Sequence, residues 1–209
     1  MAKFEVCCHK FADLSEHNYG VSILNNSKYG FATVGDVMRL SLLRSPKAPD
    51  DTADMGHHRI SWAVMPHQGP LGAQTVRAAF NFNNALKLMS TSASEESSSV
   101  ALKHLPITLK GDDNLILDTV KRGEDDADII SPQIDLPKKQ NKSVIIRIYD
   151  SLGGRGRGTV ETTWSLIKVF KTNLLEDDEE EVSFSSNDGS RFEVEVGPFQ
   201  VCSYRLVLA

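Results

Sequence analysis

The stretch SVIIRIYDSLGG, residues 143–154, decides the fold class of this chain. It begins with branched and aromatic side chains and ends in a polar, glycine-rich turn, which is typical of a strand buried in a sheet. The apolar part is far shorter than the roughly 18 residues that a membrane-spanning helix needs, and no other run in the chain comes close to that length. We therefore expect a buried β-strand here, followed by a turn.

Short segments on both sides of this run show the same features, alternating or solidly apolar between Gly, Asn, Asp and Pro. Many short strands without long helices between them favour a β-sandwich. We predict an all-β fold, either one sandwich or two stacked β units, with at most one short helix. That helix falls at 75–82, where an irregular strand would also fit. The predicted strands are 20–25, 37–43, 60–66, 98–105, 114–120, 143–149, 158–164, 166–171, 191–196 and 199–208.

A segment rich in Ser, Thr and Glu near residue 90 suggests a boundary. We place a first β unit at 1–90 and a second at 91–209, with one continuous domain as the alternative. The charged segment 123–141 is predicted to be flexible surface. The acidic run 176–181 is predicted to be a solvated turn that keeps strand edges from pairing with other molecules.

The composition excludes several classes of partner. A net charge of −5 gives no reason to expect nucleic acid or an anionic membrane. Met1–Phe11 carries charged residues in place of an apolar signal core, so we expect a soluble, unexported chain. The three cysteines, Cys7, Cys8 and Cys202, are a poor basis for a disulfide framework and favour a reducing compartment. Cys7 and Cys8 fit a strand better than a reactive thiol site.

The densest polar cluster lies in the proline-containing loop from Arg44 to His67, and such loops often carry binding sites. Zinc would need several of its carboxylates and imidazoles to converge, but adjacent His57 and His58 point to opposite faces of an extended chain. Paired carboxylates also cleave glycosidic bonds, yet neighbouring aspartates more often bind backbone amides in turns. We therefore expect no metal ligand and no catalytic residue in this chain. The candidates weighed are Asp50, Asp51, Asp54, His57, His58 and His67.

The glycine-rich segment 150–158 lacks the lysine and the following helix of a phosphate-binding loop. We interpret it as a hairpin connection with exposed Arg155 and Arg157, in preference to a loop that contacts sugar or another protein. Trp62 and Trp164 lie in apolar strand contexts and are expected to be buried.

Ordered blocks along nearly the whole chain resemble the C-terminal region of glycoside hydrolase family 38, the class II α-mannosidases, and most closely its cytosolic and vacuolar members. One position departs from the family pattern Asp-Met-Gly-Arg-His, because His57 stands where the arginine is expected. The blocks are FEVCCHKFADLSE (4–16), YGVSILNNSKYG (19–30), MRLSLLRSP (38–46), ADMG (53–56), VRAA (76–79), VKRGED (120–125) and IRIYDSLGG (146–154).

This resemblance implies retaining, zinc-dependent hydrolysis of terminal α-mannosyl residues of oligosaccharides and glycoproteins. In the family the zinc and the nucleophilic aspartate belong to an N-terminal β/α barrel, which a helical bundle follows, and this chain resembles neither. We expect the isolated chain to be inactive and to hold no cofactor. Its expected partners are the barrel and helical domains and a mannose-containing oligosaccharide, with a homo-oligomer as an open option, in the cytoplasm or vacuole.

Loops of the family's C-terminal β domains reach the substrate cleft, so the resemblance implies a supporting role there for Arg44, Asp50, Asp54 and His58. An arginine at such a place clamps sugar hydroxyls or holds a loop carboxylate. The alternative function is a non-catalytic β-sandwich that binds carbohydrate or protein, and a third is a purely structural segment.

Overall fold

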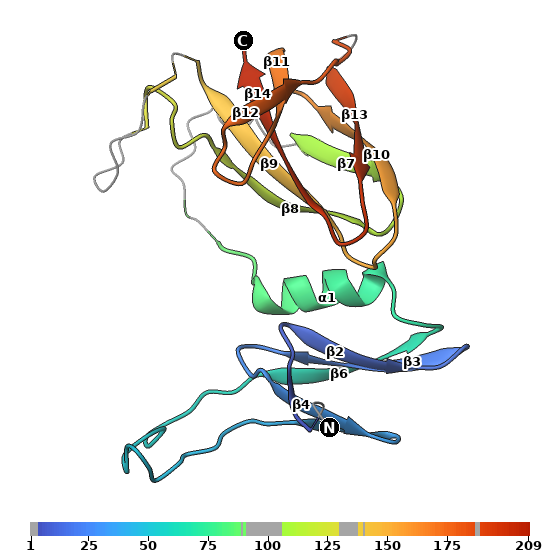
Figure 1. Cartoon of the computed structure of the whole chain (residues 1–209), viewed down its shortest axis with the longest axis vertical. Helices are drawn as coiled ribbons and strands as arrows, with labels where there is room; N and C mark the ends of the chain where they lie inside the picture. Colours follow the sequence, from blue (N-terminus) through green and yellow to red (C-terminus); the bar gives the residue numbers. More distant parts are fainter. Residues whose placement is uncertain (1–3, 89, 91–105, 130–137, 140, 187–188) are drawn as a thin grey trace. The chain divides into compact units, whose positions relative to one another are not determined.

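The computed structural model describes residues 4–88, 90, 106–129, 138–139, 141–186 and 189–209 (Figure 1). These residues form antiparallel sheets and a single helix, so the predicted all-β class is confirmed. The chain divides into two compact units, residues 1–90 (unit 1) and 91–209 (unit 2). No helix in the described part is long and apolar enough to cross a membrane.

Unit 1 contains two three-stranded sheets and the helix α1. One sheet has the strand order β1-β4-β5 and the other β2-β3-β6, with antiparallel neighbours throughout. The element bounds are β1 Val6–Cys7, β2 Phe11–Ser15, β3 Tyr19–Asn25, β4 Gly30–Val34, β5 Val37–Leu40, β6 Trp62–Gln68 and α1 Ala73–Asn83.

The central strand β3 alternates between two environments, because successive side chains of a strand point to opposite faces. Ser22 is fully buried and meets Thr75 of α1, so this face of the sheet lies under the helix. Val21 and Ile23 point to the opposite face and stay partly exposed. The helix formed where its apolar spacing predicted one, with Val76 and Ala79 buried.

Unit 2 is a β-sandwich. Its five-stranded sheet has the order β12-β11-β14-β9-β8, and its three-stranded sheet has the order β13-β10-β7. The bounds are β7 Ile107–Gly111, β8 Leu115–Arg122, β9 Ser143–Asp150, β10 Gly156–Thr162, β11 Leu166–Thr172, β12 Asp178–Glu181, β13 Ser190–Val196 and β14 Val201–Leu208.

The core of unit 2 is built from alternate residues of facing strands. Ile146 and Ile148 of β9 meet Tyr204 and Leu206 of β14 and Phe192 of β13 in one buried cluster. The rings of Phe192 and Tyr204 lie 5.5 Å apart between centroids, a distance typical of favourable aromatic pairs. Strand β9, which carries the apolar run of residues 143–149, therefore lies at the centre of the sandwich.

The prediction of a hairpin at 150–158 is wrong. Strand β9 pairs with β8 and β14, whereas β10 pairs with β7 and β13, so the segment crosses from one sheet to the other. Asp150 holds the crossing, because its carboxylate accepts hydrogen bonds from the backbone N–H groups of Gly153 and Phe199 at 2.7 and 2.8 Å. Arg155 and Arg157 are exposed, as predicted.

Three further predictions need correction. Trp62 is 53% exposed. The acidic run contains strand β12, since Glu180 and Glu181 pair with β11. Part of the supposed flexible surface is fixed, because Asp126 is completely buried. The strand predicted at 98–105 lies outside the described residues.

Candidate functional site

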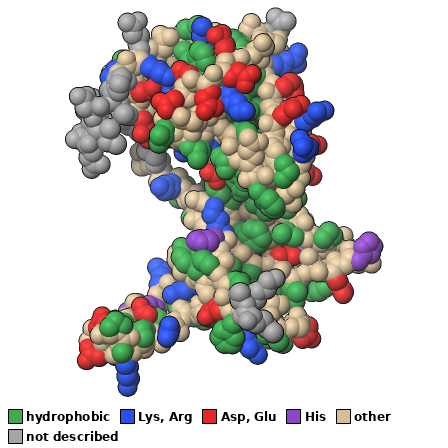
Figure 2. Space-filling model, viewed as in Figure 1, with side chains coloured by type: hydrophobic (Ala, Val, Ile, Leu, Met, Phe, Trp, Pro, Cys, Tyr) green, Lys and Arg blue, Asp and Glu red, His purple; other side chains and the backbone are tan. Residues whose placement is uncertain are grey.

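A loop of residues 41–61 connects β5 to β6 and carries the four residues proposed to support a substrate cleft. In Figure 1 it projects away from the sheets of unit 1. Arg44, Asp50, Asp54 and His58 are all exposed. Figure 2 shows acidic, basic and apolar side chains next to one another at the tip of this projection. The loop therefore offers a mixed, exposed polar surface.

Local hydrogen bonds within residues 45–58 hold the loop together. The Ser45 hydroxyl donates to the Ala53 carbonyl at 3.1 Å, and His58 Nε2 donates to the Asp54 carbonyl at 2.6 Å. Asp54 also accepts a long bond, 3.4 Å, from the Ser45 N–H. Asp54 and His58 are thus brought together inside the loop.

Asp50 and Arg44 have different surroundings. Both the N–H and the hydroxyl of Thr52 donate to Asp50 Oδ1 at 2.9 Å. The backbone bond first and the hydroxyl bond second lower the pKa of Asp50, which is the behaviour of a turn-forming aspartate. Within the described residues, no hydrogen bond or ion pair joins Arg44 to a carboxylate, so its guanidinium is exposed and available.

The described residues do not fit a zinc site. They contain no group of three or more His, Cys, Asp and Glu side chains that would hold a metal ion. His67, a candidate from the sequence, lies in β6 and is buried against Asp13 of β2, with 2.6 Å between Nε2 and Oδ2. Zinc, which the family resemblance implies, therefore has no ligand set here.

The buried pair of Asp13 and His67 is structural. Ser22 also donates its hydroxyl to the same Asp13 oxygen and lies 3.3 Å from the Thr75 hydroxyl. A nucleophilic triad needs the serine on the histidine, whereas here both groups bind the carboxylate. The network instead ties β2, β3 and β6 to α1. Asp13 was missed in the sequence because nothing near it in the chain marks it as buried.

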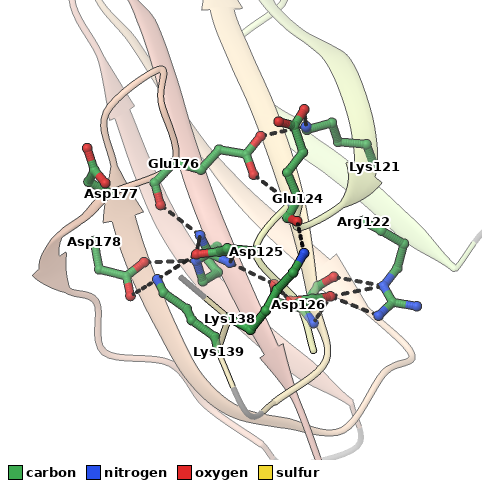
Figure 3. A network of polar contacts seen from close by, with 12 residues as sticks. Lys121, Arg122, Glu124, Asp125, Asp126, Lys138, Lys139, Glu176, Asp177 and Asp178 are labelled. Carbon is green, nitrogen blue, oxygen red and sulfur yellow. Dashed lines mark hydrogen bonds and ion pairs between the residues drawn. The ribbon is translucent and has the colours of Figure 1, made fainter. Parts of the chain in front are cut away.

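A polar network in unit 2 centres on Arg205 of β14, and Figure 3 shows the residues Asp125, Asp178 and Glu176 that take part in it. The Arg205 side chain is 1% exposed. Its guanidinium donates to both carboxylate oxygens of Asp125 at 2.7 and 3.1 Å and to Asp178 at 2.9 Å. Its remaining donors reach the Ser143 hydroxyl and the Glu176 carbonyl at 2.9 and 2.7 Å. Since five N–H groups have five bonds, none is left for a ligand.

Asp126 extends the network beneath the same loop. It accepts bonds from the Ser143 N–H and hydroxyl at 2.8 and 2.6 Å and is paired with Arg122 at 2.8 Å. Gly123 is required here by space, since a side chain at this position would meet Ser143, Arg205 and Asp126. Two loops are thereby fixed onto the outer face of the five-stranded sheet, and the network has a structural role.

The pKa of Asp125 reflects its place in this network. Burial acts to raise it, but the hydrogen bonds and charge of Arg205, with the charge of Lys139, bring it below the ordinary 3.8. Figure 3 shows Asp125, Asp178 and Lys139 converging at this point.

Two family models match this chain: "Glycosyl hydrolases family 38 C-terminal domain" over residues 1–52 and "Glycosyl hydrolases family 38 C-terminal beta sandwich domain" over residues 136–204. The chain belongs to glycosyl hydrolase family 38. The first match includes Arg44 and Asp50, and the second includes most of the sandwich of unit 2.

The similar proteins are named α-mannosidases. The chain is 42% identical to "Alpha-mannosidase" of Saccharomyces cerevisiae, over 99% of this chain and 19% of the relative. It is 35% identical to "Alpha-mannosidase G" of Dictyostelium discoideum and 33% identical to human "Alpha-mannosidase 2C1", over 99% of this chain and 18% of each relative. This family 38 chain thus spans less than a fifth of the length of these relatives.

Replacing Arg205 by Gln in this family 38 chain should lower the free energy of unfolding of unit 2 by about 3–5 kcal/mol, because Asp125 and Asp178 lose their buried partner. Arg157→Gln is the matched control, since its ion pair with Glu195 is largely exposed, and it should cost less than about 1 kcal/mol. Urea unfolding followed by Trp164 fluorescence in a Trp62→Phe background measures both. Equal losses would contradict the central place of Arg205.

Acid should remove the contribution of Asp125 to stability. A carboxyl whose folded-state pKa is depressed stabilises the fold above its ordinary pKa, and this stability is lost as the pH falls through the folded value. Unfolding free energies measured from neutral pH to below 3.8 should therefore fall less steeply for Asp125→Asn than for the unchanged chain. Glu179→Gln, on the exposed strand β12, should keep the original slope. An unchanged slope for Asp125→Asn would refute this assignment.

Proposed function

We propose that this chain is the C-terminal β region of an α-mannosidase that removes terminal α-mannosyl residues from oligosaccharides or glycoproteins with retention of configuration. The observation that carries the proposal is the match over 99% of the chain to proteins named α-mannosidases. The zinc, the nucleophile and the acid/base carboxylate are proposed to lie in the remainder of the enzyme, which works in the cytosol or vacuole. The isolated chain is proposed to be inactive.

The contribution proposed for this chain is the projecting loop 41–61. Its residues 45–58 are fixed by the Ser45, Ala53, Asp54 and His58 contacts, and Asp50 shapes its turn. Arg44 is left with an exposed planar guanidinium, which suits bidentate hydrogen bonds to sugar hydroxyls or to a carboxylate beside the cleft. Arg44 is therefore the residue of this loop proposed to act on the substrate side.

The alternative is a separate β-sandwich that binds carbohydrate without catalysis. Two exposed aromatic residues, Tyr19 and Trp62, lie on one face of unit 1. They stand at opposite ends of that face, because β3 and β6 are antiparallel and each residue begins its strand. They therefore do not form the flat platform on which a sugar ring stacks. Calorimetry with mannose oligomers on the isolated chain tests this alternative, which measurable binding would favour.

The test of the main proposal uses a hybrid enzyme in which this chain replaces the matched region of the yeast relative. Arg44→Ala should lower kcat/KM for α-mannoside hydrolysis by at least about tenfold, equal to ~1.4 kcal/mol of transition-state stabilisation. Its thermal unfolding should stay unchanged because Arg44 is exposed. Arg59→Ala, an exposed arginine of the same loop, is the control and should leave kcat/KM unchanged.

Two results would refute parts of this account. Unchanged kinetics for Arg44→Ala would remove the role of the loop. Hydrolysis of α-mannosides by the isolated 209-residue chain would show that the catalytic groups are within it.

A further inference from the structure

The sheet β2-β3-β6 of unit 1 has a second apolar face, opposite the helix. Cross-strand pairing places Leu14 beside Val21 and Ile23 beside Val64. Trp62 and Tyr19 lie on the same face, because they are separated from these residues by even numbers of positions. Val64, Trp62 and Tyr19 are 54%, 53% and 51% exposed. One face of the sheet is thus covered by α1, and the other presents large apolar side chains.

A groove of about 590 Å³ runs along this face. The hairpin of β4 and β5 forms one wall through Met38 and Gly35, and the sheet forms its floor. Only Glu16 and Asp36 bring charge to its lining, and both are acidic. The groove therefore fits an apolar segment that carries a basic side chain at its edge.

Unit 1 has little core of its own. The large buried apolar cluster belongs wholly to unit 2. The buried hydrophobic residues described in unit 1 are mostly small: Cys8, Leu24, Phe31, Ala73, Val76 and Ala79. A small domain with so little buried apolar surface gains much of its stability by covering an exposed face with another part of the protein.

We propose that this face, defined by Leu14, Tyr19, Val21, Ile23, Trp62 and Val64, is the docking surface for the remainder of the same enzyme. The proposal rests on the proposed function. The relatives that match 99% of this chain have more than four-fifths of their length outside the match, which provides the covering polypeptide. A second copy is disfavoured, because a two-fold contact sets each patch against itself and brings Glu16 and Asp36 against like charges.

Thiol labelling tests this surface without unfolding the chain. Val64→Cys and Val120→Cys are matched variants, since Val120 lies on a strand of unit 2 and is 47% exposed. Both are made with Cys7→Ser, which removes the exposed native thiol. In the hybrid enzyme, the labelling rate at position 64 should fall at least about tenfold relative to the isolated chain, because a covered side chain reacts only after local opening. The rate at position 120 should not change.

A second pair of variants tests the same surface by thermal unfolding, without an introduced cysteine. Val64→Asp should lower the thermal unfolding temperature of the hybrid enzyme, because docking would bury an unpaired charge. Val120→Asp should leave it unchanged. Equal labelling of position 64 in the isolated chain and the hybrid, or equal effects of the two aspartates, would overturn the proposal.

Two further readouts separate the explanations. Labelling at position 64 that slows as the isolated chain is concentrated would show that a second copy covers the face, and would overturn the proposal. Hydrolysis by the hybrid is measured alongside: protection without hydrolysis supports the docking surface and contradicts the proposed function. Hydrolysis without protection at position 64 supports the proposed function and contradicts the docking surface.

Discussion

The guanidinium of Arg205 holds together the outer side of the sandwich in unit 2. It projects from β14 on the face opposite Tyr204 and Leu206. It binds two loops through Asp125 and the Glu176 carbonyl, and it binds strand β12 through Asp178. Burying a cation is costly unless its hydrogen bonds are made, and here every donor has an acceptor. The second sheet covers the inner face of the five-stranded sheet, and the segments bound to Arg205 cover the outer face around it.

In unit 1, too, both faces of a sheet need to be covered, but only one of them is covered within the unit. Its sheet β2-β3-β6 places Ser22 and His67 toward α1, where they are tied to Asp13 and Thr75. The opposite face keeps Trp62 and Val64 about half exposed. A sheet with two apolar faces is stable in water when both are covered, and in the docking proposed above the remainder of the enzyme covers the second face.

The apolar patterns predicted the strands that carry the core, because the nearly solid apolar run of residues 143–149 and the alternation in residues 191–196 both reflect burial. The patterns did not predict which segments pack on the outer face of each sheet. Arg205 lies in a mainly apolar strand, and its partner Asp125 is 80 positions away, beyond the reach of any local pattern. Likewise, an apolar context suggested a buried Trp62, but the pattern only shows that its face is apolar. The charged segment 123–141 was interpreted as flexible surface because the partners of its buried carboxylates, such as Ser143 of β9 and Arg205 of β14, are distant in the sequence.

In the loop 41–61, too, the sequence predicted the local structure but not the long-range contacts. Proline and aspartate content predicted an irregular, polar loop, and the structure shows Asp50 in a turn and Asp54 beside His58. The role of Arg44, Asp50, Asp54 and His58 at a substrate cleft remains a prediction, because a cleft built from two parts of an enzyme leaves no pattern in one of them.

The central claim is that unit 2 is stable by itself, whereas unit 1 depends on the rest of the enzyme. Native-state hydrogen exchange measures both in one experiment, because each amide reports the free energy of its own opening. In the isolated chain, amides of β3 and β6 should exchange well before those of β9 and β14, and in the hybrid enzyme only those of β3 and β6 should slow. Equal protection of both units in the isolated chain would contradict the account.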